Sequence, residues 1–165
     1  MSQLKDDENG IWLKVPKDTF FLGLVRTFVS DLARRSGFPP QQAAQIEMAV
    51  DEACTNAIQH GTLRAAAVEE HAKNMSLRVD VTPGRIGITL IDNGQKYAFE
   101  EYRKEDLDRA LEQMQVGGLG LYIIKQFMDE VLYFHEPEVG NVLTMAKYVS
   151  PPSPEEEAPI DPMEP

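Results

Sequence analysis

The chain has 165 residues, of which 42% are hydrophobic and 26% are charged, and its net charge is −11. This composition is typical of one soluble globular domain, and a domain of this length needs no disulfide or metal in order to fold. The single cysteine, Cys54, has no partner for an intramolecular disulfide, which favours a reducing compartment. The sequence shows neither an apolar run of about 20 residues that could span a bilayer nor a secretory signal. We therefore expect a cytoplasmic protein without a membrane partner.

The excess of acidic side chains, 27 against 16 basic ones, disfavours a protein that binds nucleic acid directly. Five of the net negative charges lie in residues 150–165, a segment that also holds six prolines and no Lys or Arg. Such a segment can bury almost no apolar surface, so we expect an acidic, proline-rich disordered tail there. Residues 1–10 are expected to be disordered as well, which leaves residues 11–149 as the folded domain.

The first part of the chain predicts one strand and two helices. The apolar run 11–15, closed by Pro16, is typical of a strand. Apolar residues then recur at helical spacing until Gly37, and a second helix is predicted from Pro39-Pro40 to Gly61. The predicted core-facing residues of the first helix are Phe20, Phe21, Leu24, Val25, Phe28, Val29 and Leu32, and those of the second are Ile46, Val50, Ala53 and Ala57.

Strands dominate the second part. Alternating apolar residues on either side of Pro83-Gly84 predict an antiparallel hairpin over about 77–90. A glycine-rich turn at 117–120 leads into an apolar helix over 121–129, and a second hairpin is predicted from the runs 131–134 and 142–148. This order predicts an α+β fold, a two-layer α/β sandwich in which helices cover one face of a mixed sheet.

Glu52 and Asn56 form the first motif that could carry chemistry. They lie four residues apart in the second predicted helix, so their side chains share one helical face. A carboxylate beside an amide oxygen suits Mg²⁺ and a polarised hydroxyl group. An exposed polar helix face is the commoner meaning of this spacing when it stands alone. His60, one turn further on, is interpreted as a structural residue, and Cys54 as a small packed residue.

Two glycine-containing motifs follow. Asp92-Asn93-Gly94 ends a predicted strand, where a carboxylate can accept a hydrogen bond from an exocyclic amine and glycine lets a ligand approach the backbone. An ordinary turn explains that motif equally well. The segment Gly117 to Leu121 opens a predicted helix with three glycines, which expose N–H groups at the positive end of the helix dipole and could bind phosphate. A flexible start to a core helix is the alternative, while the Rossmann and P-loop patterns do not match.

The three motifs occur together in the order seen in the ATP-binding domain of gyrase, Hsp90, histidine kinases and MutL, and the chain resembles that superfamily, whose fold is the Bergerat type. Within it, the chain is most similar to the bacterial anti-sigma-factor serine kinases. The similarity rests on EACTNAIQHG at 52–61, GGLGLYIIKQFMDEV at 117–131 and GNVLTMAKYV at 140–149. It covers about residues 11–149. One departure is that Gln95-Lys96 follows Gly94 where the wider superfamily has a second glycine.

The resemblance implies roles for individual residues. Glu52 would be the catalytic general base, and Asn56 would bind both the nucleotide and Mg²⁺. Asp92 would accept the adenine amino group, with Gly94 beneath the base. Thr144, on the last predicted strand, would support adenine recognition from the floor of the pocket.

The resemblance also implies a phosphate-binding segment and a lid. The N–H groups of Gly118 and Gly120 would reach the phosphates. The nucleotide-binding residues of this segment would be Gly117, Gly118, Leu119, Gly120 and Leu121. Residues 95–117 would form an ATP lid, whose basic residues Arg103, Lys104 and Arg109 are either phosphate contacts or part of a solvated face.

By the same resemblance, the protein would be an anti-sigma factor and a serine/threonine kinase that uses ATP and Mg²⁺. It would bind a sigma factor, phosphorylate a STAS-domain anti-sigma-factor antagonist, and act as a homodimer. Arg26 lies near where the family has a basic partner contact, although it could equally be a solvated residue. Two alternatives stay open: an ATP-binding regulatory module without kinase activity, and an ATPase domain of a DNA-remodelling machine, which the acidity and length disfavour.

Overall fold

The computed structural model describes residues 10–61, 73–93, 119–136 and 139–149. The predicted lid, the predicted C-terminal tail and residues 1–9 lie outside these ranges. Three predicted site residues, Gly94, Gly117 and Gly118, also lie outside them, as do the three basic residues of the predicted lid.

The described strands form one sheet with the order β1-β2-β3-β5-β4. The strands are β1 Ile11–Pro16, β2 Asn74–Thr82, β3 Arg85–Asp92, β4 Glu130–Glu136 and β5 Gly140–Tyr148. Every neighbouring pair in this order is antiparallel, so the prediction of a mixed sheet was wrong for the described strands. The crossover from β3 to β4 does make these two strands parallel, but β5 lies between them and pairs with both in the antiparallel sense.

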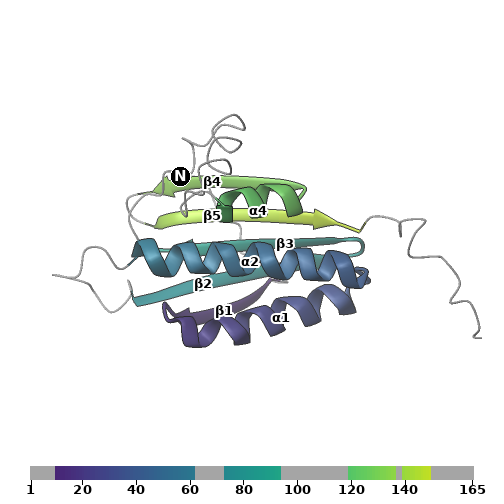
Figure 1. The fold of residues 1–165 in the computed structure, drawn as a ribbon, viewed down its shortest axis with the longest axis horizontal. Coiled ribbons are helices and arrows are strands. Elements are labelled where there is room, and N and C mark those ends of the chain that lie inside the picture. Colours follow the sequence, from purple (N-terminus) through teal and green to yellow (C-terminus); the bar gives the residue numbers. More distant parts are fainter. Residues whose placement is uncertain (1–9, 62–72, 94–118, 137–138, 150–165) are drawn as a thin grey trace, which may run out of the picture.

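The α-helices of the described ranges all pack on one face of this sheet, which gives the predicted two layers (Figure 1). A short 3₁₀ turn, η1 Thr19–Phe21, precedes α1 Leu22–Arg35. The second helix, α2 Pro40–Gly61, runs along the middle of the sheet, and α4 Leu119–Phe127 lies over β5 (Figure 1). Gly37 separates α1 from α2 with a φ of +87°, a conformation that glycine adopts at little cost.

The core lies between the helices and the sheet, and α2 contributes to it as predicted. Its residues Ile46, Val50, Ala53 and Ala57 are all buried. The stripe predicted for α1 was too wide, because only Val25 and Val29 of its members are fully buried. Phe20 is 82% exposed and Leu24 is 53% exposed. Phe20 belongs to the 3₁₀ turn, so the helical spacing counted from it does not place it on the buried face of α1.

One row of residues crosses the sheet at the end where β3 finishes. The strand register aligns Val15, Met75, Asp92, Asn141 and His135 on five successive strands. Side chains alternate between the two faces of a strand, and the burial of Val15 and Met75 in the core places this row on the helix-covered face. The row therefore brings polar groups of β3, β5 and β4 beneath the helices.

No helix within the described ranges is long and apolar enough to cross a membrane.

Candidate functional site

Glu52, Asn56 and Gly120 meet where the first turn of α4 packs against α2. A Cβ atom placed on Gly120 would lie 2.7 Å from Glu52 Oε2 and 3.5 Å from Asn56 Nδ2. The carboxylate and the amide of the first motif therefore lie directly beside the helix start of the third motif. A side chain larger than hydrogen at position 120 would occupy the space that the Glu52 carboxylate uses. The structure thus brings together residues that lie more than sixty positions apart in the sequence.

The Glu52 carboxyl group is tuned toward neutral pH. Its pKa is raised above the usual value of 4.5, chiefly by burial and further by the negative charge of Asp51. Both causes disfavour the ionised form. A carboxylate with a raised pKa is a stronger proton acceptor once ionised, which is the property required of a general base.

Asp51, the neighbour that contributes to this shift, is itself paired with α1. Arg26 Nη1 lies 3.5 Å from Asp51 Oδ2, with the Arg26 side chain 44% exposed. The other oxygen, Asp51 Oδ1, is one of two buried side-chain polar atoms in the described part of the chain that have no hydrogen-bond partner. Arg26, which was expected to be either near a partner contact or a solvated residue, thus pairs with the residue next to Glu52.

Asp92 lies in a buried polar network. Its side chain is 1% exposed, its Oδ1 accepts a hydrogen bond from Lys17 Nζ, and its Oδ2 accepts one from Asn141 Nδ2 at 3.0 Å. The Asn141 side-chain oxygen in turn accepts a hydrogen bond from the Tyr133 hydroxyl at 2.7 Å and lies 3.0 Å from His135 Nδ1. Hydrogen bonds from β4 therefore fix the amide orientation that lets Asn141 donate to Asp92.

Gly140 allows β5 to begin this close to Asp92. Its φ is +95°, and a Cβ atom at this position would lie 2.4 Å from the Asp92 carbonyl oxygen and 2.8 Å from Asn93 Cα. No real Cβ atom tolerates such distances to backbone atoms. The glycine is therefore required both by its conformation and by the close approach of the turn that follows β3.

Thr144 does not lie with the other predicted site residues. It pairs with Thr89 of β3 and Leu132 of β4, and the two threonine hydroxyls lie 3.3 Å apart. Asn141 and Thr144 are three positions apart in one strand, so their side chains point to opposite faces of the sheet. Thr144 lies on the face opposite the described helices, and the predicted role on the pocket floor is corrected. Asn141 occupies the position beside Asp92 instead.

Lys17 and Asn141 are functional candidates that sequence reasoning missed. Lys17 follows a strand at the far edge of the sheet, and nothing in its local sequence indicates a partner 75 positions away. The sequence pattern predicts that Asn141 is part of a hairpin loop. A glycine directly before it, at the start of a strand, could nevertheless have indicated a functional position. A glycine at the start of a strand indicates that another backbone approaches closely. The side chain of the next residue then lies beside that neighbouring segment.

Cys54 has the character predicted for it. It is fully buried, and burial together with the charge of Asp51 raises its pKa to about 12. The thiol therefore stays protonated at neutral pH, which confirms a packed residue and excludes a thiolate nucleophile at this position.

The described residues could bind a hard cation only together with ligands from water and a bound substrate. Within the described residues, no group of three or more His, Cys, Asp or Glu side chains could hold a metal ion. The Glu52 carboxylate and the Asn56 amide lie beside the start of α4. Carboxylate and amide oxygens suit Mg²⁺, which typically keeps several waters and takes its remaining ligands from substrate phosphates. The site thus fits a cation that arrives with a phosphorylated ligand.

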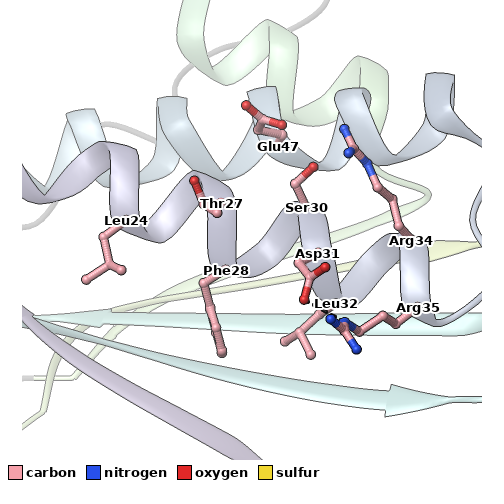
Figure 2. Close-up of a pocket in the computed structure, with 9 residues that line it drawn as sticks. All are labelled: Leu24, Thr27, Phe28, Ser30, Asp31, Leu32, Arg34, Arg35 and Glu47. Atoms are coloured by element: carbon pink, nitrogen blue, oxygen red, sulfur yellow. Dashed lines mark hydrogen bonds and ion pairs between the residues drawn. The ribbon is translucent and has the colours of Figure 1, made fainter.

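A separate hollow lies on the surface of α1, away from Glu52 and Asp92. Leu24, Phe28 and Leu32 extend from one side of this helix, one turn apart, whereas Thr27 and Ser30 extend from the other side, toward Glu47 of α2 (Figure 2). Among the predicted nucleotide-binding residues that the structure describes, none lines it. The α1 surface therefore offers an apolar feature that is distinct from the site at α2 and α4.

Comparisons with known proteins identify the family of the chain. Residues 16–147 match the family described as the histidine kinase-like ATPase domain. The serine-protein kinase RsbW of Bacillus subtilis (strain 168) is 31% identical over 89% of this chain and 90% of its own length. RsbW of Bacillus velezensis is 32% identical over 85% of this chain and 86% of its own.

Solved structures agree on the fold. The RsbU and RsbW domains of Rv1364c from Mycobacterium tuberculosis align with a TM-score of 0.60 at 18% identity over 87% of this chain, which spans 33% of that longer chain. The SiaB–SiaC complex from Pseudomonas aeruginosa aligns with a TM-score of 0.61 at 14% identity, over 84% of this chain and 88% of the other. The chain belongs to the histidine kinase-like ATPase family, and within it to the RsbW serine-protein kinases.

Proposed function

We propose that this serine-protein kinase uses Mg-ATP to phosphorylate a serine of a STAS-domain anti-sigma-factor antagonist, and that it also binds a sigma factor. The observation that carries the proposal is the meeting of Glu52, Asn56 and the start of α4 at Gly120. Phosphoryl transfer depends mainly on positioning and on neutralising charge, so a base, a metal ligand and a phosphate-binding helix start are the parts required.

Glu52 acts in this proposal as the general base. It accepts the proton of the attacking serine hydroxyl, and its raised pKa keeps its affinity for that proton high. Burial also excludes part of the water that would otherwise solvate the carboxylate. Asp51 supports the same property through its charge and is held in place by Arg26.

Asn56 and the start of α4 bind the charged part of the nucleotide. The N–H groups of the first turn, around Gly120, point to where phosphates bind at a helix N-terminus. Asn56 would hold Mg²⁺ together with the phosphates, and the ion would neutralise charge on the transferred group. Gly117 and Gly118 are proposed to belong to the same segment.

Asp92 recognises the base. Its carboxylate accepts the exocyclic amine of adenine, and Asn141 holds the carboxylate in place from β5. The glycine after this turn, Gly94, is proposed to lie beneath the base. Adenine recognition at Asp92 and phosphate binding at Gly120 would place one nucleotide along the helix-covered face of the sheet.

The surface of α1 is the proposed partner surface. Phe20 and Leu24 are largely exposed, and Arg26 lies between this surface and the catalytic helix. A partner that draws Arg26 away from Asp51 would change the charge felt by Glu52. The structure of SiaB with SiaC shows that a protein of this fold forms a complex with a second protein. A homodimer is part of the same proposal.

Incubation of the protein with Mg-ATP and each STAS-domain antagonist of the same cell tests this proposal. The expected product, identified by mass spectrometry, is one antagonist phosphorylated on a single serine. The matched control is Glu52→Gln, which should bind Mg-ATP and transfer no phosphate. Binding of Mg-ATP by the wild type without transfer to any antagonist would favour the regulatory module over the kinase.

A further inference from the structure

Lys147 is a buried lysine near the end of β5, and it contacts α4 at the end that lies away from Glu52. It is 7% exposed and shares the helix-covered face of the sheet with Met145, because side chains two positions apart in a strand point to the same side. Its Nζ donates a hydrogen bond to the backbone oxygen of Phe127 at 2.6 Å. Phe127 is the last residue of α4, so a lysine of the sheet lies at the C-terminal end of this helix.

This contact stabilises the C-terminal end of α4 in two ways. The last four carbonyl groups of an α-helix have no partner within the helix, and a cation near them also interacts favourably with the negative end of the helix dipole. In α4, the Ile124 carbonyl oxygen accepts a hydrogen bond from the Met128 N–H, and Lys147 supplies the donor for the Phe127 carbonyl oxygen.

Asp129 ties the chain after α4 to the same part of β5. Its backbone N–H donates to the Ala146 carbonyl oxygen at 2.9 Å, and its Oδ2 accepts a hydrogen bond from the Tyr148 backbone N–H at 2.8 Å. Together with the contact between Lys147 and Phe127, these hydrogen bonds hold the end of α4 on three successive residues of β5. We call this set of contacts the α4 anchor.

The α4 anchor affects the proposed phosphate site because α4 is short. The helix has nine residues, and a helix of fewer than about 12 residues is marginally stable unless other elements hold it. Ile124 is fully buried and packs the middle of α4 on the core, while Gly120 lies beside Glu52 at its start. About 10 Å of helix separates Gly120 from Phe127, so a tilt of the anchored end also moves the first turn.

We propose that Lys147 is a positioning residue, which through the α4 anchor holds the N–H groups at the start of α4 in place for the phosphates of the nucleotide. This inference rests on the proposed function, because it takes the start of α4 as the phosphate site. Lys147 lies at the far end of the helix and acts only through it. Its loss should therefore weaken the binding of the phosphates and leave the binding of the base unchanged.

The test compares the dissociation constants of ATP and adenosine, measured by titration calorimetry at fixed Mg²⁺ for the wild type and Lys147→Met. The two ligands share the base and the ribose and differ in the phosphates. Methionine fills the space of the lysine but brings neither a donor nor a charge. We expect ATP binding to weaken roughly tenfold, about the effect of losing one hydrogen bond to a charged group, and adenosine binding to stay unchanged. Lys14→Met is the matched control, because Lys14 is an exposed lysine of β1.

Two further variants separate positioning from loss of folding, which thermal unfolding of each variant measures. Lys147→Arg keeps the charge and the donors, so it should retain most of the ATP affinity that Lys147→Met loses. Asp129→Ala removes another contact of the α4 anchor at an exposed position and should weaken ATP binding by a smaller factor, again without an effect on adenosine. Asp129→Ala decides the test if Lys147→Met is unfolded.

Equal weakening of ATP and adenosine in these variants would show a merely structural role of Lys147 and overturn the proposal. Unchanged ATP binding in a variant that lacks the contact would also overturn it, while the proposed function would stand. Failure of the wild type to bind ATP would instead overturn the proposed function and this inference with it.

Discussion

Gly120 of α4 lies against the carboxylate of Glu52 on α2, and a Cβ atom at position 120 would lie 2.7 Å from Glu52 Oε2. The contact couples the helix start that is proposed to bind phosphate to the residue that is proposed to accept the serine proton. It also explains why the residue at this position has no side chain. A methyl group there would not disturb the backbone of α2, but it would displace the flexible end of Glu52.

Gly120→Ala should therefore lower activity without lowering stability. Alanine favours the helix by up to about 1 kcal/mol over glycine, while a catalytic group displaced by about 1 Å can lose roughly a hundredfold in rate. We expect kcat/KM for phosphotransfer to fall by that order and the unfolding midpoint to stay or rise. Gly23→Ala is the matched control, because a Cβ atom on Gly23 of α1 would meet nothing within 4 Å. Equal activity of the two variants would contradict the assigned contact.

Glu52→Gln should abolish phosphotransfer and leave Mg-ATP binding intact. Glutamine has nearly the same shape as glutamate but cannot accept the serine proton, and loss of a general base typically costs roughly 10²–10⁴ in rate. Single-turnover transfer to the antagonist and calorimetric ATP binding measure the two properties separately. Glu130→Gln, which changes an exposed acid of the edge strand β4, should transfer phosphate at the wild-type rate.

Asp51→Asn should move the acid limb of the pH–rate profile to lower pH. Glu52 is active when deprotonated, so its raised pKa makes activity fall as the pH drops through that value. The charge of Asp51 is one cause of the rise, and its removal lowers the pKa of Glu52 and keeps the base ionised at lower pH. Burial, the larger cause, remains, so the limb should stay above the position of an ordinary glutamate. Asp31→Asn, which changes an exposed acid of α1, should leave the profile unchanged.

Local patterns predicted most of the elements, and pairing between distant strands explains most of the corrections. The stripe of α2 and the hairpin around Gly84 depend on spacing within one element, and both are confirmed. The face on which Thr144 lies depends on its register with β3 and β4, which its own sequence does not specify. The contact between Lys17 and Asp92 likewise requires that β1 and β3 flank β2. Nucleotide binding by Gly117 and Gly118 stays a prediction, since both glycines lie outside the described residues.

Gly140→Ala should destabilise the fold more than Gly84→Ala, although both glycines have a positive φ, +95° and +74°. A Cβ atom at Gly84 meets nothing within 4 Å, so that variant pays only the conformational cost of about 1–2 kcal/mol. At Gly140 the Cβ atom meets the Asp92 carbonyl oxygen and Asn93 Cα, so the turn or the start of β5 must move. We expect a loss of about 3 kcal/mol or more in the free energy of unfolding by urea, together with weaker ATP binding because Asn141 moves with β5. Equal losses in the two variants would show that the backbones at Asp92 and Gly140 separate easily, and would remove the reason for placing Asn141 in the base-recognition site.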